Sequence, residues 1–277
     1  MFPETVAAVS GPVGLSRAGG RLWPFDQALD DIRSHGAAMA FPYAAGMAPH
    51  ALAVAWALET LAWRQQSSLG PVAFALALAT FARWAGCSAA QAALMERLGR
   101  PRTSLGHRWK TVLGARFPFA LISVWGWLVP PVGLYAMALS ALAGPACLAS
   151  DKPALGVVAG ILRMTAGQTR GLMAYAALSL GGWIVLALNI FGLAAAAVEW
   201  LLPSVLGVDA PLLSRMLWGP VGLAGMAYGA FVAVDFIGCA AAVRLHARAG
   251  DRRDGGDLHL RLADLEKRER HAPGRHG

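Results

Sequence analysis

Long apolar runs separated by short polar or basic stretches dominate the sequence, and their lengths predict helices. A run of about 20 apolar residues crosses the roughly 30 Å hydrocarbon core of a bilayer as a helix. The pattern therefore predicts an all-α, polytopic transmembrane helix bundle over residues 37–243, flanked by an N-terminal tail (1–36) and a C-terminal tail (244–277). The apolar runs occupy residues 37–63, 69–86, 117–149, 172–197 and 217–243.

The run at residues 117–149 is too long for a single crossing and contains two adjacent prolines, Pro130 and Pro131. As one helix it would be about 50 Å long, well beyond the hydrocarbon thickness. Proline has no N–H to donate, and it disfavours the helical conformation of the residue before it. We therefore expect a hairpin that turns at Pro130–Pro131.

The distribution of basic residues predicts the topology. The chain carries 24 Lys and Arg against 16 Asp and Glu, a net charge of +8. The basic residues gather in both tails and in residues 95–116 and 150–171, and cytoplasmic segments of membrane proteins collect such residues. Both ends of the 117–149 run are then cytoplasmic. Full crossing by the hairpin gives six membrane helices, which we expect, and a re-entrant hairpin gives four.

This charge pattern also indicates location and partners. We expect a multi-pass protein of the bacterial cytoplasmic (inner) membrane with both termini in the cytoplasm. Anionic lipids at the cytoplasmic face are its expected partners, with a membrane protein as a further one. Nucleic acid is not expected, because the basic residues flank apolar segments and lack interleaved aromatic residues.

Two stretches have the pattern of short amphipathic interfacial helices. Residues 23–36 alternate Trp, Phe, Leu and Ile with acidic residues, which favours a helix on the membrane surface or, alternatively, an exposed first turn of the first membrane helix. Residues 150–171 are predicted to return along the inner surface. In the C-terminal tail, Leu258, Leu262 and Leu265 fit either a docking helix or a solvated tail.

No motif in the sequence predicts a catalytic, cofactor-binding or metal-binding residue. HExxH, phosphate-loop and nucleophile-elbow patterns are missing. The three cysteines (Cys87, Cys147 and Cys239) are isolated in or beside apolar stretches and are interpreted as small apolar residues. We therefore expect a protein that is not an enzyme and that uses no cofactor.

Ionisable residues at membrane depth are the strongest candidates for function, because such groups are costly in lipid and need partners. The candidate intramembrane polar network contains Glu59, Arg83 and Asp235, with Asn189 as a neutral member. Asp235 lies near the middle of the last run, and we hypothesise that it pairs with Arg83. The pair is either structural or part of a polar pathway or lipid-headgroup site.

Small residues in the last run predict close helix packing. Gly222, Gly225 and Gly229 fall near one helical face, and the spacing of the last two is that of a G-x-x-x-G motif. Such a face packs against another helix of the same chain or against a second subunit.

Several short motifs resemble a known family. They are "WPFDQALDDIR" (23–33), "LVPPVGLY" (128–135), "LAGPACLAS" (142–150), "ILRMTAGQTRGL" (161–172) and "RDGGDLHLRL" (253–262). Together they resemble the membrane domain of glycerophosphoryl diester phosphodiesterases and related stand-alone bacterial membrane proteins. Pro131 departs from the usual Gly and Asp254 from the usual Glu. Because the soluble catalytic barrel is missing, the resemblance implies fold and location but no phosphodiesterase activity.

Two functions remain open on these observations. The first is a non-catalytic accessory or scaffold component of an envelope, export or lipid-related system. The alternative is a small transporter or lipid-handling protein that uses the intramembrane Asp, Arg and Glu residues. A water-accessible cavity lined by Asp235 and Arg83 would favour transport or lipid handling, whereas a dry, fully packed bundle would favour the scaffold.

Overall fold

The computed structural model describes residues 23–62, 69–100, 103–126, 128–166, 169–207 and 211–253, and every regular element in these ranges is helical. The elements are α1 (Trp23–Ala62), α2 (Leu69–Arg97), α3 (Leu105–Gly126), α4 (Pro130–Leu148), α5 (Ala154–Thr165), α6 (Thr169–Ala196), the π-helical turn η2 (Ala197–Leu201), α7 (Leu202–Leu206), α8 (Pro211–Trp218) and α9 (Pro220–Arg253).

Four helical stretches in the described ranges are long and apolar enough to cross a membrane. They are Leu69–Arg97, Pro130–Leu148, Gly171–Val205 and Pro220–Ala249. Large apolar side chains are exposed along the bundle, among them Phe41 at 81% and Leu155 at 81%. Exposed large apolar side chains on these helices suit contact with lipid, in agreement with the four stretches that are long and apolar enough to span a membrane.

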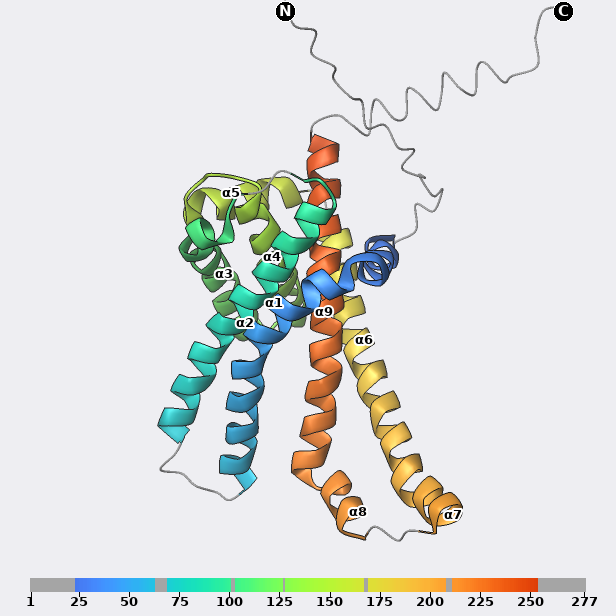
Figure 1. Cartoon of the computed structure of the whole chain (residues 1–277). Helices are drawn as coiled ribbons and strands as arrows, with labels where there is room; N and C mark the ends of the chain where they lie inside the picture. The colour runs from blue at the N-terminus through green and yellow to red at the C-terminus, as the bar shows by residue number, and fades with distance from the viewer. Residues whose placement is uncertain are drawn as a thin grey trace, which may run out of the picture.

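The helices run between two ends of the molecule, as Figure 1 shows. The start of α1, the end of α2, the connection between α4 and α5 and the end of α9 gather at one end, which we call the terminal end. The end of α1, the start of α2 and helices α7 and α8 lie at the opposite end. Helices α3, α4 and α5 lie beside the half of the bundle nearest the terminal end.

The first helix continues without a break through residues 23–62, where the sequence pattern predicted a separate short helix over 23–36. Pro42 and Pro49 lie inside it, and Figure 1 shows the helix bending along its length. A proline bends a helix because its ring clashes one turn back and a hydrogen bond is lost.

The N-terminal part of α1 packs on the bundle itself. The Phe25 ring stacks on Tyr175 of α6 with 5.3 Å between centroids. Asp31, only 5% exposed, accepts two hydrogen bonds from Arg244 of α9, one of them 2.6 Å long. This part of α1 therefore packs against α9, and its Asp31 side chain is buried. In a helix that lies on the membrane surface, such a side chain would face solvent.

Helices α3 and α4 lie side by side, joined by a short connection at residues 127–129. At their bases, the Thr103 N–H donates to the Leu148 carbonyl (2.8 Å), and Arg108 donates to the carbonyls of Ser150 (2.7 Å) and Lys152 (2.5 Å). The last carbonyls of a helix have no hydrogen-bond partner within the helix. These bonds supply partners for carbonyls at the end of α4 and just after it.

Backbone donors at residues 128–133 are either paired or absent. Pro130 and Pro131 are the first two residues of α4 and have no N–H. The next two amides, of Val132 and Gly133, both point to the Val129 carbonyl, at 2.8 and 3.4 Å. The four N-terminal positions of α4, where a helix normally exposes free donors, therefore have none free.

Several helices extend further than the apolar runs predicted. Helix α2 continues to Arg97, which places Arg83 at its centre, although the run predicted a position near a helix end. The stretch at residues 199–215, which separates the last two apolar runs and is predicted to be a turn, is helical at residues 199–206 and 211–215. Helix α9 continues to Arg253, into the predicted C-terminal tail, and the leucines at 258–265 lie outside the described residues.

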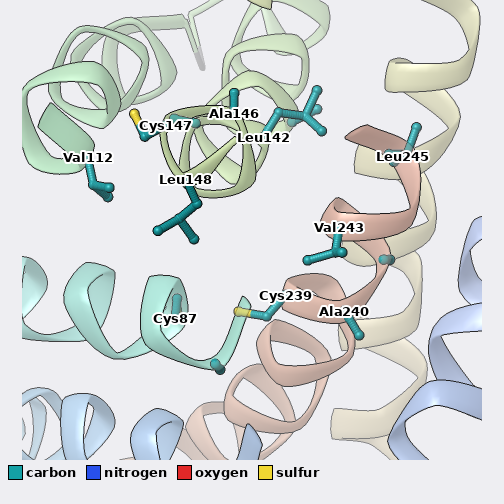
Figure 2. Packing of buried hydrophobic residues seen from close by; sticks show 14 of the residues in the cluster. Cys87, Val112, Leu142, Ala146, Cys147, Leu148, Cys239, Ala240, Val243 and Leu245 are labelled. Carbon is teal, nitrogen blue, oxygen red and sulfur yellow. The ribbon is translucent and has the colours of Figure 1, made fainter. Parts of the chain in front are cut away.

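The core lies where α2, α3, α4 and α9 converge. Figure 2 shows Leu148 of α4 and Val243 of α9 pointing into this region, and both are nearly inaccessible to solvent. Three consecutive alanines of α9, Ala240, Ala241 and Ala242, are also fully buried. Small residues allow helices to approach closely, and van der Waals contact is a principal attraction between helices in lipid.

Candidate ligand cavity

A cavity of about 360 Å³ lies between α2, the α3–α4 pair, α6 and α9. Its polar lining residues are Thr80, Arg83, Gln91, Arg116, Ser123, Ser140, Tyr175, Ser179 and Asp235, with Cys87 and Cys239. Its apolar lining includes Trp84, Met137, Leu180, Trp183 and Phe231. A volume of this size is at the lower end of the range for small-molecule sites, about 300–1,000 Å³.

Arg83 and Asp235 form a two-pronged ion pair at the edge of this cavity. Arg83 Nη2 lies 2.5 Å from Asp235 Oδ1, and Nε lies 3.2 Å from Oδ2. The guanidinium also lies over the Phe231 ring, 4.6 Å from its centroid. A parallel pair of charge-assisted hydrogen bonds fixes both side chains, so the two charges offset each other.

Two further groups hold the Asp235 carboxylate. The Tyr43 hydroxyl of α1 donates to Oδ2 at 3.1 Å and also lies 2.8 Å from the Val232 carbonyl oxygen. The Cys87 thiol donates to the same oxygen at 3.4 Å. Asp235 thus ties α1, α2 and α9 together, which explains how a carboxylate is tolerated at this depth.

Arg116 is the second basic residue of the cavity and has a very different environment. It is 4% exposed, and its Nη2 donates to Gln91 Oε1 at 3.1 Å. Its Nε is buried and has no hydrogen-bond partner. Gly144 of α4 faces the same pair, and a Cβ there would overlap Gln91 Oε1 and lie 2.8 Å from Arg116 Nη2. A larger residue at position 144 would therefore displace the Gln91 and Arg116 side chains from this contact.

The structure brings together only part of the polar network expected from the sequence. Arg83 and Asp235 meet, but Glu59 and Asn189 do not line the cavity. Glu59 is exposed three residues before the end of α1. Asn189 donates to the Val185 carbonyl of its own helix (2.7 Å), which satisfies the amide locally.

The glycine face expected in the last run is open in this chain. A Cβ added at Gly225 or Gly229 meets nothing within 4 Å, and Gly222 is half-buried. The close glycine contact lies elsewhere, between Gly46 of α1 and Gly86 of α2. Small residues at every fourth position of α2 (Ala82, Gly86 and Ala90) are the sequence signal for it.

Sequence reasoning missed Arg116, Gln91 and Tyr175 as cavity residues, and Tyr43 as a partner of Asp235. The depth of Arg116 in α3 follows from a helix that already begins at Leu105, within the basic stretch 95–116 that the charge pattern assigns to a cytoplasmic segment.

Three cavity residues have the chemistry of metal ligands. The ligand atoms of Cys87, Asp235 and Cys239 lie within 4.8 Å of one another. The Asp235 carboxylate is already bonded to Arg83 through both oxygens. A cation here would have to displace or repel that guanidinium, so the arrangement disfavours a metal ion.

The fold and the cavity define the class of protein: a helical membrane protein with a partly polar cavity between its helices. Comparison of the chain with protein-family models, curated proteins and solved structures gives no match. The resemblance to the membrane domain of glycerophosphoryl diester phosphodiesterases therefore stays a prediction.

Proposed function

We propose that this chain is a small transporter or lipid-handling protein of the bacterial inner membrane. The observation that carries the proposal is the cavity lined by Arg83 and Asp235, walled by α2, α6 and α9. A scaffold needs only surfaces that partners recognise, and a hollow with charged walls inside the bundle gives it no advantage. A ligand-binding protein needs such a hollow, with a few polar groups in an otherwise apolar wall.

The topology that supports this function has both termini in the cytoplasm. The terminal end carries the basic stretches around α3 and α5, and we propose that it faces the cytoplasm. The α3–α4 pair then enters the membrane from that side and returns to it. The paired amides at its turn suit apolar surroundings, because unpaired backbone donors are costly in lipid.

The native cysteines provide a test of the cavity. Cys87 and Cys239 line it, whereas Cys147 faces away. Figure 2 shows Cys239 pointing from α9 toward α2, and Cys147 pointing from α4 to the opposite side. The Cys147 thiol lies 3.6 Å from the Thr111 carbonyl, and all three cysteines are buried, so Cys147 is a matched internal control.

The experiment compares three variants that each keep one native cysteine, in phosphatidylcholine nanodiscs, with a small water-soluble methanethiosulfonate reagent. If the protein transports or handles a ligand, Cys87 and Cys239 should react with the reagent at rates at least about tenfold higher than Cys147. In a packed bundle without an accessible cavity, all three thiols would be equally protected. Equal protection of all three thiols would return the scaffold as the better explanation.

The depth of the hairpin has its own test in a cysteine-free protein. A cysteine replacing Val132 lies two residues from the turn at a site that is 45% exposed. Labelling of this cysteine by an outside-only reagent supports full crossing and six helices. Protection there, with both flanks of the hairpin inside, means a re-entrant pair.

A further inference from the structure

We propose that the cavity binds an organic anion, an acidic group on an apolar body, and that Arg116 is its principal partner. The acidic group is a carboxylate or a phosphate ester. This inference rests on the proposed function, because it needs a cavity that a ligand can enter. It adds the chemical class of the ligand and the residue that recognises it.

Arg116 has more donors than the protein satisfies. A guanidinium carries five N–H groups, and the described residues give Arg116 one hydrogen bond, to Gln91, while its buried Nε has no partner. No carboxylate among the described residues pairs with it. Burying a charge without a counter-charge is costly, so the site is incomplete in one respect: it lacks an acceptor that carries negative charge.

Gln91 cannot supply that charge, and its orientation is fixed. Its Nε2 donates to the carbonyls of Ala141 (3.3 Å) and Cys239 (3.4 Å), so Oε1 must be the atom that faces Arg116. An amide oxygen is a neutral acceptor, and the positive charge of Arg116 is left uncompensated. Gln91 therefore holds the guanidinium in place for a ligand.

Asp235 is equally unable to compensate Arg116. Both of its oxygens are bonded to Arg83, and one also accepts from Tyr43. The charged residues that line the cavity are two arginines and one aspartate, which gives one net positive charge. Low-dielectric walls strengthen the field of that charge, so the cavity attracts anions and repels cations.

The remaining lining selects the body of the ligand. Trp84, Met137, Trp183 and Phe231 form an apolar wall, and an alkyl or aromatic group would bury its surface there. The planar guanidinium matches carboxylate and phosphate oxygens in a two-pronged geometry. A water-soluble organic acid and an anionic lipid present the same chemistry, and experiment can separate them.

The test uses Cys239 as a reporter in a variant with Cys87→Ala and Cys147→Ala, reconstituted in phosphatidylcholine nanodiscs. The rate of modification by N-ethylmaleimide is measured with octanoate or with octanol, its neutral counterpart. Octanoate should slow the reaction at a concentration at least tenfold lower than octanol. Arg116→Gln should remove that difference, since charge-assisted hydrogen bonds are worth a factor of about ten or more.

Two further variants complete the design. Arg163→Gln removes an exposed arginine of α5 that lies outside the cavity and should leave protection by octanoate unchanged. Arg116→Lys keeps the charge without the two-pronged geometry and should retain part of the protection. If Arg116→Gln fails to fold, the octanoate–octanol comparison on the parent protein and the Lys variant still decide the matter.

A second arm identifies the source of the anion. Nanodiscs containing phosphatidylglycerol, without octanoate, slow Cys239 modification if a lipid headgroup occupies the site, and octanoate in phosphatidylcholine does so if a soluble acid does. Equal effects of octanoate and octanol together with no effect of phosphatidylglycerol overturn the anion proposal. A thiol that never reacts without ligand, yet reacts after denaturation, instead overturns the proposed function and this inference with it.

Discussion

The contact between Gly46 and Gly86 allows a stability prediction worked directly from distances. A Cβ added at Gly46 would lie 2.5 Å from the Gly86 Cα, 2.7 Å from the Ala82 carbonyl oxygen and 2.8 Å from the Gly86 nitrogen. A Cβ at Gly86 would lie 2.6 Å from the Gly46 Cα. Every one of these neighbours is backbone, so no side-chain rotation can relieve the overlap.

The expected cost follows from the separation that α1 and α2 would need. Carbon atoms pack best at about 3.5–4.0 Å, so Gly46→Ala must push the helices apart by about 1 Å. Overpacking of this kind costs about 1–3 kcal/mol. The higher helix propensity of alanine returns about 1 kcal/mol, which leaves a net loss of up to about 2 kcal/mol.

The last helix provides the matched control. Gly225 and Gly229 lie inside a helix with nothing within 4 Å of an added Cβ, so Gly225→Ala keeps the gain in propensity without the overlap. This variant should be as stable as the parent protein or more stable by up to about 1 kcal/mol. The two Gly→Ala substitutions are therefore expected to change the stability in opposite directions: Gly46→Ala lowers it, and Gly225→Ala leaves it unchanged or raises it.

Apparent midpoints of thermal unfolding at one heating rate, in one detergent, measure this difference, since membrane proteins often unfold irreversibly. Gly46→Ala should also change the reactivity of Cys239, because Tyr43 lies one turn away and donates to Asp235. A midpoint for Gly46→Ala equal to or above that of Gly225→Ala would refute the close approach of α1 and α2.

Three other predictions concern ion pairs and the hairpin turn. Asp235→Leu leaves Arg83 buried without its partner and should lower stability by about 3–5 kcal/mol, whereas combining it with Arg83→Met should recover most of the loss, as a double-mutant cycle of midpoints would show. Arg244→Gln removes the partner of buried Asp31 and should increase the rate of limited proteolysis near the start of α1. Pro131→Ala adds an N–H without an acceptor, and it should cost about 1–3 kcal/mol in nanodiscs if the turn lies in lipid; no change would place the turn in water.

Helix positions could be predicted from the sequence because lipid imposes a length on apolar runs. Helix α2 contains the whole run at 69–86, and α6 together with η2 contains the run at 172–197. Helix α9 contains most of the run at 217–243. The Arg83–Asp235 contact follows from similar reasoning: few ionisable residues occupy the apolar runs, and opposite charges in lipid attract strongly.

Contacts between distant segments could not be predicted in this way. Asp31 and Arg244 are 213 positions apart, and nothing in the local pattern of either segment identifies its partner. Arg116 has the same difficulty, because hydrophobic periodicity assigns it to a helix but does not reveal which neighbours it meets. Gly46 packs against Gly86 through the crossing of two helices, and the local pattern of either helix does not predict where they cross.

The doubled proline and the buried arginine are connected through the hairpin. A helix that starts in apolar surroundings must hide the amides of its first turn, and two prolines followed by two amides directed at Val129 achieve this. With its turn satisfied, the α3–α4 pair can lie against α2 and α9, held at its base by Arg108. That position brings Arg116 to Gln91 and closes one wall of the cavity. Because the turn and Arg116 belong to the same pair of packed helices, a substitution at Pro130 or Pro131 is expected to affect the Arg116–Gln91 contact as well as the turn.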